Sequence, residues 1–253
     1  MNLTTGTQSG LGRFIYEYFG GLSFDRSNSL EDLETYSAKN LDTIFHCAFN
    51  RGNEIDRHSL GKFLTDNVIL TQELVKIPHK KFIFISTVDI YPKTKSSVSE
   101  DCQIQVKLLN EPYQVTKYIS ENIVTQTCKN YLIVRLSALL GKYSKPNSLS
   151  KIRKNENAEL TLTPNSNFNY VLHLDVARFL EIAIQKDLTG IYNIASSENI
   201  TISEVAKHLD KKVNFGSFFY NVGNVNNAKA ASVYPLIEKT SRQVISEYLE
   251  EIP

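Results

Sequence analysis

Short apolar segments rich in strand-forming residues alternate with helical patterns through the first two-thirds of the chain. The expected strands are residues 3–5, 22–25, 43–49, 81–87 and 131–136, and the expected helices between them are residues 11–19, 60–76 and 112–129. This alternation is typical of a parallel sheet with helices on both faces. Residues 82–85 (FIFI) are apolar at every position, which indicates a central strand that is buried on both sides.

The connection after the second expected strand is short. Residues 25–43 are too few for a helix, another strand and a second helix, which a Rossmann sheet normally has at this point. We therefore predict an α/β protein with a Rossmann-type, doubly wound parallel sheet that is shortened after its second strand. A chain of 253 residues with 42% apolar character is long enough for such a domain and one smaller lobe.

The pattern changes after Gly141. Residues 145–157 are polar and rich in lysine. They are followed by expected strands at residues 159–163, 170–174 and 190–195 and expected helices at residues 175–186, 202–209 and 241–251. We predict that residues 1–141 form the Rossmann domain. Residues 142–253 are predicted to form a small α/β lobe at the carboxyl edge of the sheet, with strands that return to the main sheet.

Composition argues against several classes of protein. The 28 basic and 27 acidic residues give a net charge of +1 without a basic block, which argues against nucleic-acid binding. Cys47, Cys102 and Cys128 form no CxxC pair, so neither a disulfide framework nor a zinc or other metal site is expected. The first residues do not resemble a secretory signal, and no apolar run approaches the roughly 20 residues that span a bilayer. We expect a cytoplasmic protein that binds no membrane.

A glycine-rich loop follows the first expected strand and opens the first expected helix. Residues 5–12 read TGTQSGLG. Glycines at such a turn let a pyrophosphate approach the backbone, where amides at the helix N-terminus bind it. We predict that Gly6, Gly10, Leu11 and Gly12 contact a dinucleotide, which makes residues 1–141 an NAD(P)-binding domain. An ordinary glycine-rich turn is the alternative.

Asp25 ends the second expected strand, and Arg26 follows it. A carboxylate at this position accepts hydrogen bonds from the adenosine ribose of NAD, whereas an arginine pairs with the 2′-phosphate of NADP. The two residues predict either cofactor, with a slight preference for NAD. A solvated strand end without either role is the alternative interpretation.

Tyr113 and Lys117 are four residues apart in an expected helix, a spacing that puts both side chains on one face. A nearby ammonium lowers the pKa of a phenol from about 10 toward neutrality, which makes tyrosine a usable acid and base. Thr87 ends the expected strand at residues 81–87 and brings a hydroxyl to the edge where α/β sheets bind ligands. The three residues therefore form a candidate catalytic set.

Together these motifs resemble the short-chain dehydrogenase/reductase superfamily, in particular its extended, NAD-dependent epimerase/dehydratase branch. The resemblance covers nearly the whole chain. Segments similar to motifs of that branch are residues 44–48 (IFHCA), 86–91 (STVDIY), 134–141 (VRLSALLG), 173–177 (HLDVA) and 190–194 (GIYNI). The resemblance implies a Rossmann fold, an NAD or NADP cofactor, and an epimerase or oxidoreductase that acts on a sugar.

The resemblance also implies roles for single residues. Tyr113 takes the place of the catalytic acid and base, and Thr87 that of the hydroxyl that bonds the reacting oxygen. Lys117 is expected to hold the nicotinamide ribose and to tune Tyr113, and Asn67 to position a structural water. Ala48 ends the strand segment that borders the cofactor.

Two positions differ from the sugar-nucleotide enzymes of the branch. Ala138 stands where many of them carry a substrate-binding asparagine, and no arginine precedes Tyr170, where the substrate pyrophosphate would need one. We predict an epimerase or reductase of a small-molecule substrate, a nucleotide sugar, with a homodimer as one possible assembly. The alternatives are a catalytically silent NAD(P)-binding regulatory or scaffold protein and a reductase of a small non-nucleotide carbonyl.

The residues after Thr87 bear on the type of reaction. Sugar dehydratases of the family follow the catalytic threonine with an Asp-Glu pair, which protonates the leaving hydroxyl and removes a proton from the adjacent carbon. Here the two positions are Val88 and Asp89, and valine cannot supply a proton. We therefore predict epimerisation or reduction rather than dehydration, with epimerisation slightly favoured.

Overall fold

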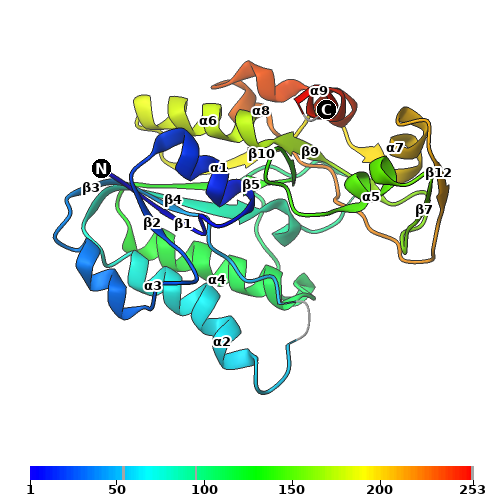
Figure 1. The fold of residues 1–253 in the computed structure, drawn as a ribbon. Helices are drawn as coiled ribbons and strands as arrows, with labels where there is room; N and C mark the ends of the chain where they lie inside the picture. Colours follow the sequence, from blue (N-terminus) through cyan, green and yellow to red (C-terminus); the bar gives the residue numbers. More distant parts are fainter. Residues whose placement is uncertain (53–54, 95, 252–253) are drawn as a thin grey trace.

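The computed structural model describes residues 1–52, 55–94 and 96–251. A parallel six-stranded sheet lies at its centre, with strand order β10-β5-β4-β3-β1-β2 (Figure 1). The strands are β1 (Asn2–Thr5), β2 (Leu22–Phe24), β3 (Leu41–His46), β4 (His79–Thr87), β5 (Tyr131–Leu136) and β10 (Gly190–Ile194). The predicted α/β class and Rossmann-type parallel sheet are confirmed.

Helices cover both faces of this sheet. Figure 1 shows α1 (Gly10–Phe19) and α6 (His173–Gln185) on one face and α3 (Leu70–Leu74) and α4 (Pro112–Thr127) on the other. In β4, Phe82 and Phe84 pack in the apolar cluster on the α3 and α4 side, whereas Ile83 packs in the cluster on the α1 and α6 side. The apolar run at residues 82–85 is therefore a central strand with two buried faces, as its sequence predicts.

The connection between β2 and β3 is as short as predicted. Between them, the only regular element is a single 3₁₀ helix, η1 (Glu31–Tyr36). Consequently β2 lies at the edge of the sheet, where a longer Rossmann domain would have a further strand.

The predicted helix at residues 60–76 is interrupted. It consists of α2 (Leu60–Leu64), a π-helical turn at Thr65–Ile69 and α3. The π turn carries the buried side chain of Asn67, whose amide bonds the backbone of Asn50 instead of solvent. A wider turn of this kind changes the direction of the side chain within an otherwise continuous helix.

Two predicted strands are wrong at their ends and a third is misplaced. The strand expected at residues 43–49 ends at His46, because the next two amides bond Thr5 Oγ1. The strand expected at residues 170–174 ends at Leu172, where α6 begins. The strand expected at residues 159–163 is β7 (Asn157–Glu159), paired with β12 (Lys212–Asn214). Beyond Glu159 the two segments stay in contact through backbone bonds such as that from the Gly216 amide to the Leu162 carbonyl, at 2.9 Å.

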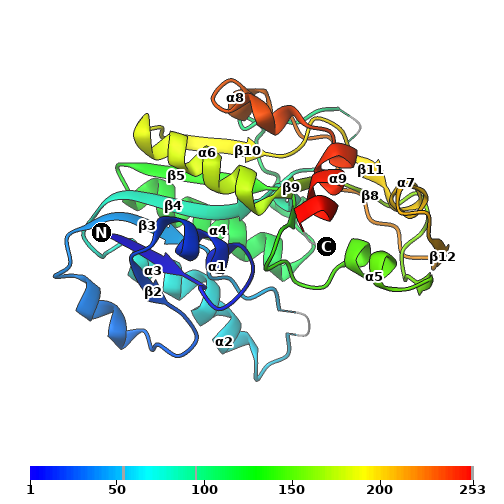
Figure 2. The ribbon, with the colours of Figure 1, turned by 45° about the horizontal axis from the view of Figure 1, so that its top comes forward.

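The chain after Gly141 builds small sheets and helices beside the carboxyl edge of the main sheet (Figure 2). The pairs are β6 (Ala138–Leu140) with β9 (Tyr170–Leu172), β8 (Asn167–Phe168) with β11 (Ile200–Thr201), and β7 with β12. The helices are α5 (Ser148–Lys154), α7 (Ile202–His208), α8 (Ala228–Ala231) and α9 (Ser241–Glu251). Strand β10 from this part pairs with β5, so it belongs to the main sheet. Within the described residues, no helix is both long and apolar enough to cross a bilayer.

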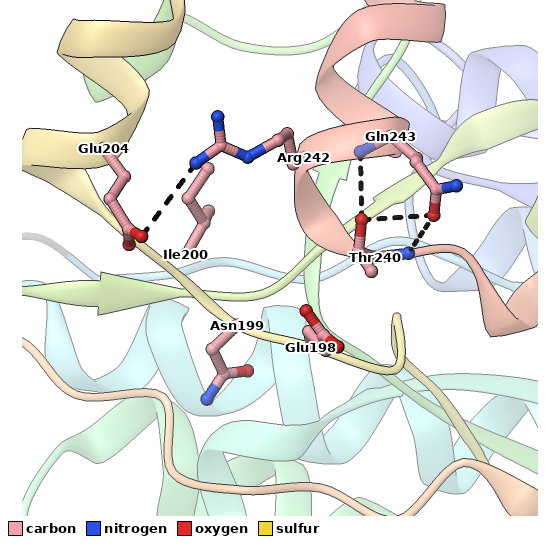
Figure 3. Close-up of a pocket in the computed structure, with 7 residues that line it drawn as sticks. All are labelled: Glu198, Asn199, Ile200, Glu204, Thr240, Arg242 and Gln243. Carbon is pink, nitrogen blue, oxygen red and sulfur yellow. Dashed lines mark hydrogen bonds and ion pairs between the residues drawn. The ribbon is translucent and has the colours of Figure 1, made fainter.

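A polar surface hollow of about 390 Å³ lies between α7 and α9 (Figure 3). Its lining residues are Glu198, Asn199, Ile200, Glu204, Thr240, Arg242 and Gln243. Arg242 and Glu204 form an ion pair across it, with 4.0 Å between their charged atoms. None of the predicted site residues lines this hollow.

Candidate functional site

The carboxyl ends of four parallel strands meet at one edge of the main sheet. Thr5 at the end of β1 pairs in register with His46 at the end of β3, and Thr87 at the end of β4 pairs with Leu136 at the end of β5. Ligands bind at this edge in open parallel α/β sheets. The sequence-predicted residues of the glycine loop, Ala48 and Thr87 all lie at or directly after these strand ends.

Gly6 and Gly12 allow three backbone segments to approach closely. Gly6 has a φ of +73°, and a Cβ there would lie 2.9 Å from Ala48 Cα. A Cβ on Gly12 would lie 2.3 Å from the carbonyl oxygen of Gly6. Gly10 has a φ of +60°, but a Cβ there would meet no atom within 4 Å. The loop therefore has open space at Gly10, at the start of α1.

The first turn of α1 offers backbone donors to an anion. The amides of Gly10, Leu11 and Gly12 have no acceptor within the helix because they lie in its first turn. The Gly10 amide donates to the Tyr143 carbonyl at 3.0 Å, and the Tyr143 hydroxyl is in turn held by Glu17 at 2.6 Å. Leu11 and Gly12 remain as donors for a phosphate. The open space at Gly10 and these amides fit the pyrophosphate of a dinucleotide.

Asp25 lies beside the glycine loop and is already well bonded. Its carboxylate accepts from the Ser27 amide at 2.9 Å and from Gln8 Nε2 at 3.1 Å. The bonds from Ser27 hold the pKa of Asp25 below its ordinary value, so the carboxylate stays ionised. Arg26 is exposed next to it. Both residues lie where the sequence predicts, at the end of β2.

His46 links β1 to the helical layer and has a structural position. Its ring is fully buried, with Nδ1 3.0 Å from Thr5 Oγ1 and Nε2 2.9 Å from Thr71 Oγ1. Burial lowers the pKa of His46 to about 3, so the ring is neutral at physiological pH. His46 therefore has a structural role in the core, and a cofactor border at residues 44–48 stays a prediction.

Asn67 clamps the loop that follows β3. Its Oδ1 accepts from the Asn50 amide at 2.7 Å, and its Nδ2 donates to the Asn50 carbonyl at 2.9 Å. Both ends of the side-chain amide are therefore engaged by protein. The bonds fix a loop of the site directly, a role that differs from the expected positioning of a water.

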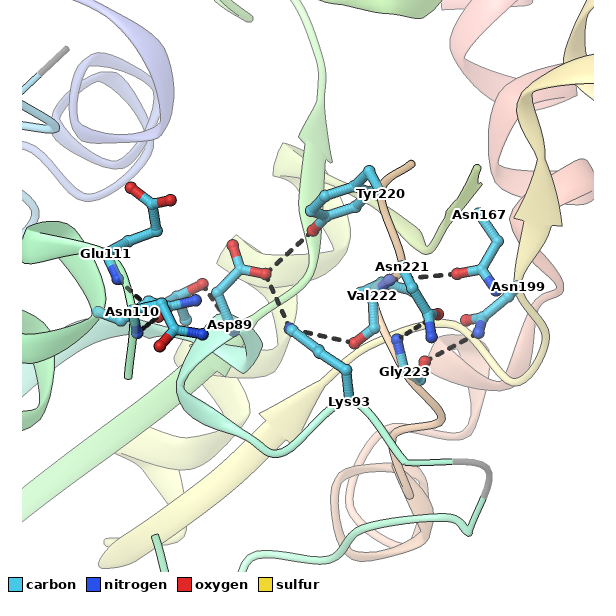
Figure 4. A network of polar contacts seen from close by, with 12 residues as sticks. Asp89, Lys93, Asn110, Glu111, Asn167, Asn199, Tyr220, Asn221, Val222 and Gly223 are labelled. Carbon is cyan, nitrogen blue, oxygen red and sulfur yellow. Dashed lines mark hydrogen bonds and ion pairs between the residues drawn. The ribbon is translucent and has the colours of Figure 1, made fainter. Parts of the chain in front are cut away.

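Thr87 and Tyr113 are brought together by β4 and α4. The Thr87 side chain acts to lower the pKa of the Tyr113 phenol, and Thr87 Oγ1 accepts from the Asp89 amide at 3.1 Å. Asp89 in turn accepts from Tyr220 OH and Lys93 Nζ, both at 3.0 Å (Figure 4). These bonds tie the end of β4 to the segment around Tyr220, from the C-terminal part of the chain. The two predicted hydroxyls thus lie at an edge contacted by both parts.

Lys117 lies on the same face of α4 as Tyr113, but its ammonium is directed elsewhere. Lys117 Nζ donates to the Ile85 carbonyl and lies 6.0 Å from the centroid of the Tyr113 ring. The Phe49 ring lies over this nitrogen at 3.7 Å, and Lys117 is 3% exposed. Burial lowers the pKa of Lys117 to about 7.

The pKa of Tyr113 differs from the expectation. Burial raises it above its ordinary value, and the positive charge of Arg51 opposes the rise more strongly than any other group. The prediction that Lys117 lowers this pKa toward neutrality is wrong for this structure. The reason is that the ammonium bonds a main-chain carbonyl instead of approaching the phenol.

A buried ionic network holds α4 against the sheet below the site. Arg135 forms a two-pronged bond with Glu121, at 3.1 and 2.7 Å, and donates to Tyr91 OH at 2.7 Å. Ser86 Oγ also donates to Glu121. Because Glu121 lies one turn after Lys117, this network fixes the position of α4 relative to Thr87. Buried pairs with two-pronged geometry give such positional specificity.

Several residues at the site belong to no recognisable sequence motif. Arg51 and Phe49 belong to an irregular loop, and Tyr220 reaches Asp89 from a distant segment. Ser137, directly after β5, has a buried hydroxyl that makes no hydrogen bond within the described residues. A buried hydroxyl without a partner is unusual, and this one lies at the edge where α/β sheets bind ligands. Its place after the predicted strand at residues 131–136 could have suggested this position.

Comparison with known proteins gives a family match and structural likenesses. A model described as the NAD dependent epimerase/dehydratase family matches residues 22–195. A comparison with curated proteins gives no match. Among solved structures, dTDP-4-dehydrorhamnose reductase from Bacillus anthracis in complex with NADP has a TM-score of 0.82 at 18% identity, with 99% of this chain and 98% of that chain covered.

Two further structures show the same likeness. UDP-glucuronic acid 4-epimerase from Bacillus cereus, in complex with UDP-glucuronic acid and NAD, has a TM-score of 0.80 at 16% identity, with 100% of this chain and 99% of that chain covered. TunA, an NAD dependent NDP-hexosamine 5,6-dehydratase, has a TM-score of 0.76 at 14% identity, with coverage of 100% and 98%. The common architecture extends over the whole of each chain.

Proposed function

Since the chain belongs to the NAD-dependent epimerase/dehydratase family, we propose that it transfers a hydride between NAD or NADP and a carbinol or carbonyl carbon of a nucleotide sugar. The membership confirms the resemblance predicted from the sequence. The interaction of Thr87 with Tyr113 at the carboxyl edge of the sheet supports the proposal, because a phenol and a second hydroxyl at the edge where ligands bind would handle the proton.

The dinucleotide is proposed to lie along the glycine loop. Leu11 and Gly12 would bond its pyrophosphate, and Gly6, Gly10 and Ala48 would line its path. Asp25 would accept from the adenosine ribose, with NAD slightly favoured, although the exposed Arg26 tolerates NADP. Residues 1–141 would thus hold the cofactor and residues 142–253 the sugar nucleotide. A cytoplasmic location and a homodimer stay predictions from the sequence.

The bound cofactor supplies a hydride acceptor or donor, and the chain's own residues handle the proton. Tyr113 would take the proton of the reacting hydroxyl in one direction and return it in the other, while Thr87 bonds the same oxygen. Lys117 would hold the nicotinamide ribose. In the structure the Phe49 ring covers Lys117, so this contact requires the ring to turn aside.

Epimerisation or reduction fits the site better than dehydration. Val88 is buried and has no proton to give to a leaving hydroxyl. Asp89 stands at the position of the base, not of the acid, and is paired with Lys93 at 3.0 Å. Elimination of water therefore lacks its acid. Epimerisation is placed slightly ahead of reduction.

The test has two arms. In one, catalytic NAD is supplied with a panel of nucleotide sugars, including UDP-glucose and UDP-glucuronic acid; in the other, stoichiometric NADH or NADPH is supplied with the corresponding keto sugars. Products are followed by mass spectrometry. An unchanged mass with a new retention time indicates epimerisation, and a gain of two hydrogens with stoichiometric cofactor use indicates reduction. Loss of water would contradict the proposed reaction type. Simple ketones serve as the comparison panel, and turnover of these alone would contradict the nucleotide-sugar substrate.

A further inference from the structure

The loop between β3 and α2 is fixed on both sides of Phe49. Thr5 Oγ1 accepts from the amides of Cys47 at 3.0 Å and Ala48 at 2.9 Å. Two bonds from Asn67 hold the backbone of Asn50. These bonds are made by buried side chains, so the loop has a defined course at the edge of the sheet. Arg51 is the next residue after Asn50.

Arg51 is the cationic residue that contacts Tyr113. Its guanidinium carbon lies 5.3 Å from the centroid of the Tyr113 ring, and its positive charge acts to lower the pKa of the phenol. The Phe49 ring meets the Tyr113 ring edge-on, with 5.5 Å between the centroids. The clamped loop thus supplies both an apolar wall and a positive charge to the same tyrosine.

Lys117, which sequence spacing favours for this task, is engaged elsewhere. Its ammonium donates to the Ile85 carbonyl and lies between the rings of Phe49, at 3.7 Å, and Phe84, at 4.6 Å. An ammonium held in this way interacts with a carbonyl and two aromatic rings rather than with the phenol. In this structure, the cation near the Tyr113 phenol is therefore Arg51 rather than Lys117.

We propose that Arg51 is a positioning residue that orients the phenol of Tyr113 and supplies the positive charge that favours its ionised form. The proposal rests on the proposed function in one respect, namely that Tyr113 is the acid and base. Arg51 is not assigned a contact with substrate. Its effect on catalysis passes through Tyr113.

Some groups around Tyr113 raise the pKa of its phenol, and others lower it. Burial raises the pKa of Tyr113, Arg51 and Thr87 lower it, and the negative charge of Asp89 raises it. Lys117 faces Tyr113 from its own helix, and Tyr220 approaches from the C-terminal part, where it bonds Asp89. Since Asp89 and burial both oppose ionisation, loss of Arg51 leaves Thr87 to favour the phenolate.

The direct test is a pH titration of Tyr113 in the protein alone, followed by the resonance of isotope-labelled tyrosine Cζ. The Tyr113→Phe variant identifies the resonance. In Arg51→Gln the midpoint should rise by about one pH unit, the lower end of the effect of a neighbouring charge. Arg51→Lys should retain much of the wild-type midpoint. Arg57→Gln, which removes the same charge from an exposed residue farther along the chain, should leave it unchanged.

The second readout is the pH profile of turnover in the oxidation direction, which requires the phenolate. The acidic limb of the profile should move to higher pH in Arg51→Gln by the same amount as the titration. An unchanged Tyr113 titration in this variant overturns the proposal, whether or not the protein turns over a substrate. A shifted titration together with full activity of Tyr113→Phe supports the Arg51 contact and contradicts the proposed function, so the two failures are distinguishable.

Discussion

Gly10 and Gly20 form a matched pair at the two ends of α1. Their φ angles are +60° and +64°, and a Cβ added to either would meet no atom within 4 Å. Alanine at a positive φ costs about 1 kcal/mol or more, and Gly20, with a ψ of −169°, lies in a backbone region that residues with a Cβ avoid. Gly10→Ala and Gly20→Ala should therefore both lower the free energy of unfolding, Gly20→Ala by at least as much. They should differ in cofactor binding, because only Gly10 borders the proposed pyrophosphate site.

The magnitude follows from the contact that is lost. A methyl group at Gly10 would occupy the space in front of the first-turn amides and displace a phosphate from a charge-assisted hydrogen bond. Such a bond is worth about 1.5–3 kcal/mol, which corresponds to a roughly 10- to 100-fold weaker affinity for NAD. Calorimetric titration of both variants with NAD and NADP measures this difference. Equal affinities for the two variants would refute the placement of the pyrophosphate at α1.

Two further predictions concern the layer below the site. Arg135→Met leaves the buried Glu121 without its ionic partner and should lower the free energy of unfolding by about 3–5 kcal/mol, measured by denaturant titration. The double variant with Glu121→Gln should recover part of this loss. Equal stabilities of Arg135→Met and the wild-type protein would contradict the prediction. Lys117 has a pKa of about 7 in the folded protein against 10.5 in its ordinary state, so between these values the unfolded chain binds more protons and stability rises with pH. Relative to Lys117→Met, the wild-type free energy of unfolding should increase by roughly 2 kcal/mol from about pH 7 to 9, and parallel pH profiles would contradict this.

The fold could be predicted wherever burial alone determines the pattern. The strand at residues 82–85 is apolar on both faces because helices cover both. This burial is visible in the sequence as an uninterrupted apolar run. The short connection before β3 follows from chain length alone. By contrast, the π-helical turn at Asn67 lies inside a segment whose apolar residues keep helical spacing. One wider turn changes this spacing too little to be recognised in the sequence.

The candidate site could be predicted only in part. Sequence spacing correctly places Tyr113 and Lys117 on one face of a helix, but it does not determine where a long side chain ends. The Lys117 ammonium bonds the Ile85 carbonyl because β4 presents that group beneath Phe49. The contact of Arg51 with Tyr113 depends on a loop that is held by distant residues, Thr5 and Asn67. No local sequence motif therefore predicts it.

The central claim is that the Tyr113 hydroxyl, beside Thr87, transfers the proton during hydride transfer. The most direct measurement is the single-turnover rate of cofactor reduction with the active nucleotide sugar, followed by nicotinamide absorbance. Tyr113→Phe should slow this rate by roughly 10²–10⁴-fold without loss of cofactor binding. Tyr118→Phe, a partly buried tyrosine on the same helix, should leave it unchanged. A near-normal rate for Tyr113→Phe would contradict the account.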